Sequence, residues 1–301
     1  MPCSQPSNGA ASGPDPDAPE DMRVEVVDSH VHLYPEKIAG KVTSSLGAKF
    51  GNAPAFEAST EGCRAHDASC GVALSVNLPV ATAPEQVEHT NAWARRVNAA
   101  EAARADGPRV LSLASLHPAC EGKAAIVAQI AADGFRGIKF HPEYQKFRFN
   151  DAAMDEVWSA MAKHELVAYL HAGGERVFSP PYHSTPTEIR KLKDRFPDLE
   201  IAAAHLGGFS MWDEAEEVLC GSEVKLDLSH TFGWMDRDQI LRMVIKHGTD
   251  KILFGTDAPW QDPADVLRAF LELPLDDDAQ RAILHDNAAA LFKLAWSLPI
   301  F

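Results

Sequence analysis

Residues 26–32 read Val26-Val27-Asp28-Ser29-His30-Val31-His32, a short β-branched run that ends in a His-x-His pair. Such a run is typical of a buried β-strand. Side chains alternate along a strand, so His30 and His32 share one face and Val31 lies on the other. Two imidazoles on one face can reach a single metal ion with little distortion. A single His-x-His motif is also common on protein surfaces, so its role has to be inferred from the rest of the sequence.

Further apolar runs follow the first, separated by longer amphipathic stretches. The eight predicted strands are Val24–Asp28, Val72–Leu78, Val110–Leu116, Gly137–Phe140, Val167–His171, Glu200–His205, Val224–Leu228 and Lys251–Gly255. Strands that alternate with helices form a parallel sheet, because each crossover needs a helix's worth of chain. Eight such units predict an α/β fold of the closed (β/α)₈ TIM barrel type. An open doubly wound sheet is the alternative, but it calls for a Gly-rich turn where this chain has Ser29-His30.

The stretches between the strands carry signals for helix starts. Thr185-Pro186-Thr187-Glu188 combines an N-cap threonine, a proline at the first helical position and a capping-box glutamate. Asp262-Pro263 is a second start of this kind. After Asn150-Asp151, one helical face is expected to collect four apolar side chains, Met154, Val157, Trp158 and Met161.

Polar residues stand at the ends of three later strands. His171 follows Val-Ala-Tyr-Leu, His205 follows Ile-Ala-Ala-Ala, and Asp257 follows Ile-Leu-Phe-Gly-Thr. A single histidine in such a place is usually structural. Barrel active sites, however, are built at the C-terminal ends of the strands. The repeated coincidence on strands one, five, six and eight therefore predicts a metal site at the C-terminal mouth.

Composition and charge restrict the candidate partners. The 301 residues include 28 Lys and Arg against 43 Asp and Glu, a formal net charge of −15. A field of this sign repels phosphate backbones and anionic bilayers, so we expect a small-molecule substrate, no nucleic acid and no membrane. The five cysteines include no Cys-x-x-Cys pair, which favours free thiols in a reducing, cytoplasmic setting. No apolar run approaches a membrane span, no secretory signal is recognised, and a homodimer is the assembly that we consider.

One boundary is expected in the chain. Residues 1–21 are rich in Pro, Gly, Ser, Ala and Asp and have no large apolar side chain after Met1, which predicts a disordered tail. Met22 follows this segment and is conceivable as an alternative start. From Arg23 onward the composition and the hydrophobic pattern are uniform, so residues 22–301 are expected to form one domain.

Five motifs, taken together, resemble the amidohydrolase superfamily, in the branch that also contains aminocarboxymuconate-semialdehyde decarboxylase. They are His30-Val31-His32, Gly137-Ile138-Lys139-Phe140-His141-Pro142, Leu170-His171-Ala172-Gly173, Ala204-His205-Leu206-Gly207-Gly208 and Gly255-Thr256-Asp257-Ala258-Pro259. They occur in the order that the family shows. The resemblance implies one catalytic divalent metal, usually zinc, with the ligands His30, His32, His171 and Asp257. It gives His205 a catalytic role rather than a ligand role.

The chemistry of these residues agrees with that division. Three neutral imidazoles and a carboxylate suit Zn²⁺ and leave a position open for water or substrate, although Mn²⁺ remains an alternative. Asp257 is the expected proton shuttle, because a carboxylate that touches both metal and water can take up a proton and pass it on. His205 is expected to polarise the substrate oxygen where negative charge develops.

Substrate-binding residues are expected in the loops at the same mouth. Lys139 and His141 are two apart, share a face and offer positive charge, and Tyr144 follows them. An axis-facing lysine neutralised by neighbouring carboxylates is the alternative for Lys139. The Pro-rich stretch of residues 173–184 contains Arg176 and is expected to form one wall of the pocket. Trp260, after the last strand, is a further candidate.

Three functions remain open at this point. The expected one is a metal-dependent hydrolase that uses an activated water on a lactone, amide or ester carbonyl, because that needs only the metal, Asp257 and His205. The second is a non-oxidative decarboxylase of an unsaturated or aromatic acid, which needs fixed positive charge such as Arg176 to hold a carboxylate. The third is a catalytically silent metal-binding protein.

Overall fold

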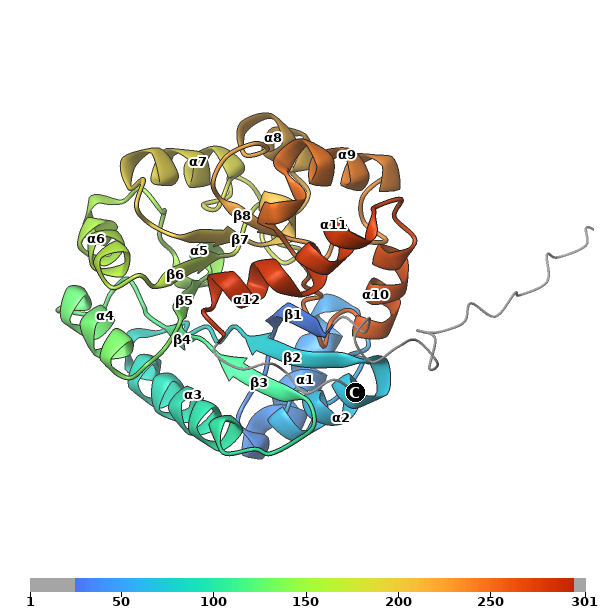
Figure 1. Cartoon of the computed structure of the whole chain (residues 1–301). Coiled ribbons are helices and arrows are strands. Elements are labelled where there is room, and N and C mark those ends of the chain that lie inside the picture. The colour runs from blue at the N-terminus through green and yellow to red at the C-terminus, as the bar shows by residue number, and fades with distance from the viewer. Residues whose placement is uncertain (1–24, 295–301) are drawn as a thin grey trace, which may run out of the picture.

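The computed structural model describes residues 25–294. Its strands form a closed parallel barrel (Figure 1). The predicted tail of residues 1–21 and the alternative start at Met22 lie outside these residues. The strands are β1 (Val26–Val31), β2 (Val72–Asn77), β3 (Arg109–Ser112), β4 (Ala114–Ser115), β5 (Gly137–Phe140), β6 (Val167–Leu170), β7 (Ile201–Ala203), β8 (Lys225–Asp227) and β9 (Ile252–Leu253). Each pairs in parallel with a neighbour in chain order.

Two junctions close the ring. The third predicted strand is interrupted at Leu113, so that β3 pairs with β2 while β4 pairs with β5. The amide of Leu113 donates to the carbonyl of Asn77 at 2.9 Å and so keeps this junction continuous. At the other junction the Ser29 amide donates to the Phe254 carbonyl at 2.9 Å, which joins β1 to the last strand. The prediction of a (β/α)₈ barrel is therefore confirmed.

Most helices surround the barrel on the outside, and the last one crosses one end of it (Figure 1). They are α1 (Glu36–Phe50), α2 (Thr60–Cys70), α3 (Val87–Ala102), α4 (Lys123–Ala132), α5 (Pro142–Gln145), α6 (Asp155–Lys163), α7 (Pro186–Arg195), α8 (Trp212–Val218), α9 (Arg237–His247), α10 (Pro263–Leu271), α11 (Asp277–Arg281) and α12 (Asn287–Leu291). The Thr185 side chain accepts from the Glu188 amide at 3.3 Å, and Asp262 caps α10 in the same way, so both predicted helix starts are confirmed. The apolar face predicted for α6 is fully buried.

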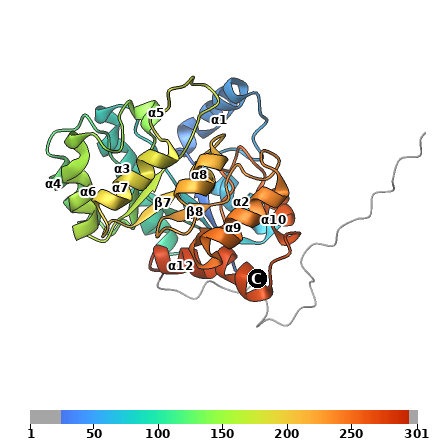
Figure 2. The same cartoon turned by 90° about the horizontal axis from the view of Figure 1, so that it is seen from above.

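The core has two layers with different partners. One layer lies between the strands and the surrounding helices, and the other fills the barrel interior with residues such as Val27, Leu74 and Tyr169. Ala288 and Phe292, from α12 and the turn that follows it, complete the interior layer at one end. Figure 2 shows α12 at the opposite end of the molecule from α1 and α5, so one end of the barrel is covered and the other carries the loops. Among residues 25–294, every helix is too short or too polar to cross a bilayer.

Candidate metal centre and its pocket

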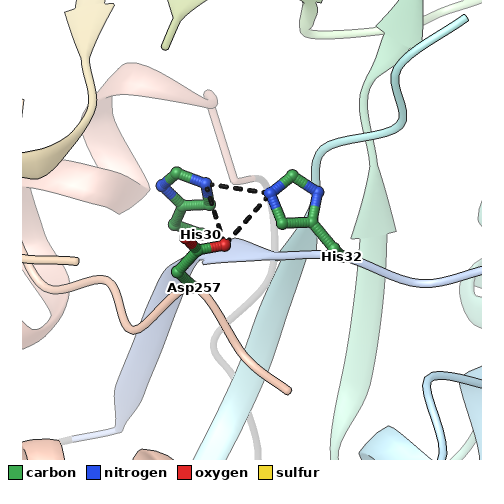
Figure 3. Close-up of side chains that lie close together, drawn as sticks. All are labelled: His30, His32 and Asp257. Atoms are coloured by element: carbon green, nitrogen blue, oxygen red, sulfur yellow. Dashed lines mark hydrogen bonds and ion pairs between the residues drawn. The ribbon is translucent and has the colours of Figure 1, made fainter. Parts of the chain in front are cut away.

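Three of the four predicted metal ligands meet at the C-terminal end of β1. His30 Nε2 lies 3.2 Å from His32 Nε2. Asp257 Oδ1 lies 3.6 Å from His30 Nε2 and 3.1 Å from His32 Nε2. Figure 3 shows the two imidazoles and the carboxylate pointing toward one another. The pairing register of β1 with β2 shifts between Asp28 and Val31, and the backbone of Asp257 is left-handed (φ 67°).

The hydrogen bonds behind the two imidazoles decide which nitrogens carry protons. His30 Nδ1 donates to the Asp227 carboxylate at 2.8 Å, and His32 Nδ1 donates to the Leu78 carbonyl at 3.0 Å, because these oxygens can only accept. In the neutral imidazoles both Nε2 atoms then present lone pairs. Lys139 Nζ lies 3.4 Å from His30 Nε2, whereas buried Asp257 Oδ1 receives no hydrogen bond. Three electron-pair donors that face each other fit a divalent cation, because without one they repel.

The electrostatics keep this donor set in the form that binds metal. Burial, followed by the charge of Lys139, lowers the pKa of His30 to about 4, so the ring is neutral near pH 7. Burial alone would raise the pKa of Asp257, but the charges of His30 and His230 outweigh this and hold it well below the usual range. Asp227 behaves in the same way, with His30 as its main stabilising partner. Both carboxylates are therefore ionised.

His171, the fourth predicted ligand, lies in a different group. Its Nε2 donates to the Gly174 carbonyl at 3.0 Å, and its Nδ1 lies 3.2 Å from His205 Nε2. Its ring stacks on His141, with centroids 3.9 Å apart, and donor atoms of His141, His171 and Glu175 approach within 4.8 Å of one another. The structure thus does not gather His171 with His30 and His32, and its role as a ligand stays a prediction.

His205 lies beside the centre, in an unusual backbone conformation. Its φ is 60° and that of Leu206 is 49°, both in the left-handed region that non-glycine residues seldom adopt. Donor atoms of His205, His230 and Asp257 lie within 4.8 Å of one another. Burial, followed by the charge of His171, holds the pKa of His205 well below its usual value, so this imidazole is also neutral. His205 thus lies at the centre as a neutral imidazole, and its catalytic role stays a prediction.

His230 was not anticipated from the sequence. It follows β8 with φ 50°, and its Nδ1 lies 2.9 Å from Asp257 Oδ2. Its amide donates to the side chain of Gln261 at 2.9 Å, which fixes the turn. The signal was present, because Leu228-Ser229-His230 repeats the pattern of an apolar strand that ends in a histidine. Asp227 was also missed, although a carboxylate inside a buried strand is unusual.

A cavity of about 330 Å³ opens above the metal centre, and all five predicted substrate-binding residues line it. They are Lys139, His141, Tyr144, Arg176 and Trp260. Apolar walls come from Tyr34, Phe50, Leu78 and Phe209 among others. Trp260 packs edge-to-face on Phe50 with ring centroids 5.1 Å apart. This composition, mostly apolar with a few convergent polar groups, is typical of a small-molecule site.

Lys139 is the buried cation of the pocket. Its side chain is 1% exposed, and its Nζ lies 3.4 Å from His30 Nε2 and 5.0 Å from the ring centroid of Tyr169. Burial lowers its pKa to about 8, against the opposing charges of Asp227 and Asp257. Lys139 therefore remains mostly cationic at neutral pH. Asp227 and Asp257 lie near it, as expected for the alternative of a lysine neutralised by neighbouring carboxylates.

The predicted wall of residues 173–184 is closed at both ends. The Gly173 amide donates to the Ser184 carbonyl at 2.7 Å, and the Ser184 hydroxyl donates back to the Gly173 carbonyl at 2.9 Å. Buried Glu143 accepts hydrogen bonds from the His183 amide at 2.5 Å and from its Nδ1 at 3.0 Å. Between these anchors the guanidinium of Arg176 lies over the ring of Trp234, 5.0 Å from its centroid. The wall thus places a cation beside an aromatic surface at the pocket.

Comparison with known proteins gives a family and a fold. The sequence profile described as amidohydrolase matches residues 27–294. No curated protein sequence matches the chain.

Three solved structures illustrate the similarity of fold. The 5-carboxyvanillate decarboxylase from Sphingomonas paucimobilis is 16% identical, with a TM-score of 0.67 over 90% of this chain and 99% of that one. A dihydroxybenzoic acid decarboxylase from Polaromonas, with bound manganese and the inhibitor 2-nitroresorcinol, is 16% identical, with a TM-score of 0.69 over 91% and 98%. An uncharacterized TIM-barrel protein from Bordetella bronchiseptica is 18% identical, with a TM-score of 0.73 over 90% and 99%.

These matches correct the expected reaction. The sequence favoured hydrolysis of a lactone, amide or ester, whereas two of the three structures are named as decarboxylases of aromatic acids and none as a hydrolase. The physical basis of the error is the charge of the pocket. The sequence placed Lys139 at the mouth but left the direction of Arg176 open, and both line the cavity. The hydrolase prediction is therefore withdrawn.

Proposed function

The chain belongs to the amidohydrolase family, and on that premise we propose that it is a divalent-metal-dependent, non-oxidative decarboxylase of aromatic carboxylic acids. The single observation that carries the proposal is the pair of cations in the pocket, the buried ammonium of Lys139 and the guanidinium of Arg176. A decarboxylase has to hold its substrate as a carboxylate and to stabilise the charge left on carbon. Two cations that line one mostly apolar cavity, Lys139 buried and Arg176 at its exposed wall, serve both needs.

The metal of this proposal is held by His30, His32 and Asp257, with His171 as the further ligand if its ring turns away from Gly174. When bound, the ion would act as a Lewis acid that holds the substrate's oxygen atoms and disperses their negative charge. Imidazole suits zinc and carboxylate suits manganese, so the donor set accepts either ion. Manganese is the first ion to test, because the Polaromonas decarboxylase contains it.

The walls of the cavity favour a flat, aromatic substrate. Phe209 and Trp260 are each less than one-tenth exposed and line the space from two loops, after β7 and β9. Tyr144 adds a hydroxyl that is buried without a hydrogen-bond partner. A ring packed between these side chains gains apolar contact, and a ring hydroxyl can satisfy Tyr144. Arg176 then stands at the wall where a charged substituent would lie.

The reaction requires one bond to break and one proton to arrive. The bond between the ring carbon and the carboxyl carbon breaks, CO₂ leaves, and the electron pair stays on the ring, where Lys139 lowers the energy of the negative charge. A proton then has to reach that carbon. Asp257 is ionised in the free enzyme, so it would first take up a proton from solvent and then pass it to the carbon, with the His230 Nδ1 atom 2.9 Å from its other oxygen. His205, neutral and close by, would orient the oxygen beside the reacting carbon.

The test is to load the full chain with Mn²⁺ or Zn²⁺ and to incubate each form with hydroxybenzoic acids and with lactones. CO₂ release and ring opening are followed separately. The proposal expects CO₂ in a one-to-one ratio with the aromatic product, and loss of this activity on Lys139→Met. The matched control is Lys191→Met on the exposed surface of α7, where the lysine only pairs with Glu188. Ring opening without any CO₂ across the acid panel would refute the proposal.

A further inference from the structure

Asp227, at the end of β8, is the hub of the hydrogen bonds beneath the metal centre. Its side chain is 0% exposed. Oδ2 accepts from His30 Nδ1 at 2.8 Å and from the Tyr169 hydroxyl at 2.6 Å. Oδ1 accepts from the amides of His205 and Ser229, both at 2.9 Å, and from the Ser229 hydroxyl. The carboxylate thus ties β1, β6, the turn after β7 and the loop after β8 to one point.

Asp227 acts from behind the pocket, since it does not line the cavity. With both oxygens occupied by protein donors, it has no lone pair left in a good direction for a substrate. Its effects must therefore pass through the groups that it holds. Two of these groups are functional, the imidazole of His30 and the backbone of His205.

The first effect concerns the tautomer of His30. A carboxylate at Nδ1 keeps the proton on that atom, and Nε2 is left as the lone-pair donor that faces His32 and Asp257. A carboxylate behind a metal-ligating histidine also raises the basicity of the ligand atom and fixes the ring's orientation. Without Asp227 the proton could occupy Nε2, and the ring would then present N–H to the metal position.

The second effect concerns the turn that carries His205. Two consecutive non-glycine residues, His205 and Leu206, have positive φ, which is costly unless the surroundings fix it. The His205 amide donates to Asp227 Oδ1, and the Trp212 indole donates to the His205 carbonyl at 3.0 Å. The peptide groups on both sides of His205 are therefore held, and Asp227 holds the one that precedes it.

We propose that Asp227 is a positioning residue that sets the His30 tautomer for metal binding and, through the same carboxylate, fixes the left-handed turn that presents His205. The inference rests on the metal centre of the proposed function. It goes beyond that function by coupling a ligand and a substrate-facing histidine through one buried group. Loss of the Asp227 carboxylate should accordingly weaken metal binding and disturb the backbone of His205 at the same time.

The experiment compares Asp227→Asn with Tyr169→Phe in the full chain. Asparagine keeps the size and one acceptor oxygen but offers an NH₂ group toward His30. Phenylalanine removes only one of the donors to the same carboxylate. We expect Asp227→Asn to weaken Mn²⁺ binding, measured by competition with a fluorescent chelator, by about 10–100-fold. Tyr169→Phe should change it less than about threefold. Equal affinity of Asp227→Asn and the wild type would overturn the inference.

A second measurement decides the matter even if Asp227→Asn does not fold. In the ¹⁵N-histidine-labelled wild type, NMR distinguishes the two tautomers of each imidazole, and His30 is assigned by loss of its signals in His30→Gln. The inference expects Nδ1–H with an unprotonated Nε2 before metal is added. A proton on Nε2 would overturn it. If the wild type binds no metal at all, the proposed function fails, while the tautomer still tests the role of Asp227.

Discussion

Metal binding should stabilise the fold by an amount that depends on His32. A ligand that binds only the folded state adds RT ln(1 + [L]/Kd), which is about 2.7 kcal/mol at a free metal concentration of 100 Kd. For a domain of this size 1 kcal/mol corresponds to about 2–4 °C in Tm, so the wild type should gain roughly 5–10 °C. The three donors that face one another in the structure are the source of this gain.

The perturbation is His32→Ala, which removes one donor while leaving His30 and Asp257 in place. His32 is 18% exposed, so truncation leaves only a small void and should alter the metal-free Tm little. If affinity falls about 100-fold, the same metal concentration equals the new Kd. The stabilisation is then RT ln 2, about 0.4 kcal/mol, or roughly 1 °C.

The assay is thermal unfolding followed by circular dichroism, with chelator-treated protein and with Mn²⁺ or Zn²⁺ added. His89→Ala is the matched control, because His89 is an exposed histidine on α3, and it should retain the full shift. A full shift in His32→Ala would place the metal elsewhere. A shift below about 1 °C in the wild type with both ions would refute the argument from converging lone pairs.

Three further outcomes are expected. His205→Ala should keep the wild-type metal content and lose a factor of about 10² or more in kcat, and loss of metal in elemental analysis would make His205 a ligand instead. Arg176→Ala should raise KM for an aromatic acid by about 10–100-fold in CO₂-release assays, the value of a charge-assisted hydrogen bond, and an unchanged KM would remove Arg176 from the site. Burial and the charge of Lys251 lower the pKa of His247 to about 4, whereas the unfolded value is 6.5. The free energy of unfolding therefore falls by up to about 3 kcal/mol as the pH drops from 6.5 to 4, because the unfolded state takes up the proton on His247 first. Urea unfolding at pH 8 and pH 4.5 checks this, and the same pH dependence in His247→Gln would contradict it.

The barrel could be predicted because its signals are local and repeated. Each apolar run followed by a helix start gives one βα unit, and eight units leave few alternatives. The break at Leu113 could not be predicted, because it depends on which neighbour each half of the strand pairs with. Pairing is a property of the assembled sheet, and one residue's preference does not reveal it.

The site was predictable where the strand pattern fixes a direction and not elsewhere. His30, His32 and Asp257 follow from the alternation and from the shared mouth of the barrel. His171 has the same sequence signature, yet its ring turns toward Gly174 in the Gly-rich loop that follows it. Asp227 shows the opposite case, because only the folded structure reveals the donors that converge on it from other strands. The preferred reaction was wrong partly for the same reason, since the direction of Arg176 in its loop could not be predicted from the strand pattern.

The anchored wall of residues 173–184 has a consequence for how this enzyme could change over evolution. Its ends are tied to each other through Gly173 and Ser184, and Glu143 fastens it to α5. Residues 175–182 can then be exchanged without moving the β1 end or the loop of Asp257. Part of the substrate choice would thus reside in a segment that can mutate separately from His30, His32 and Asp257. A library confined to this segment should yield altered acid preferences while every member keeps its metal.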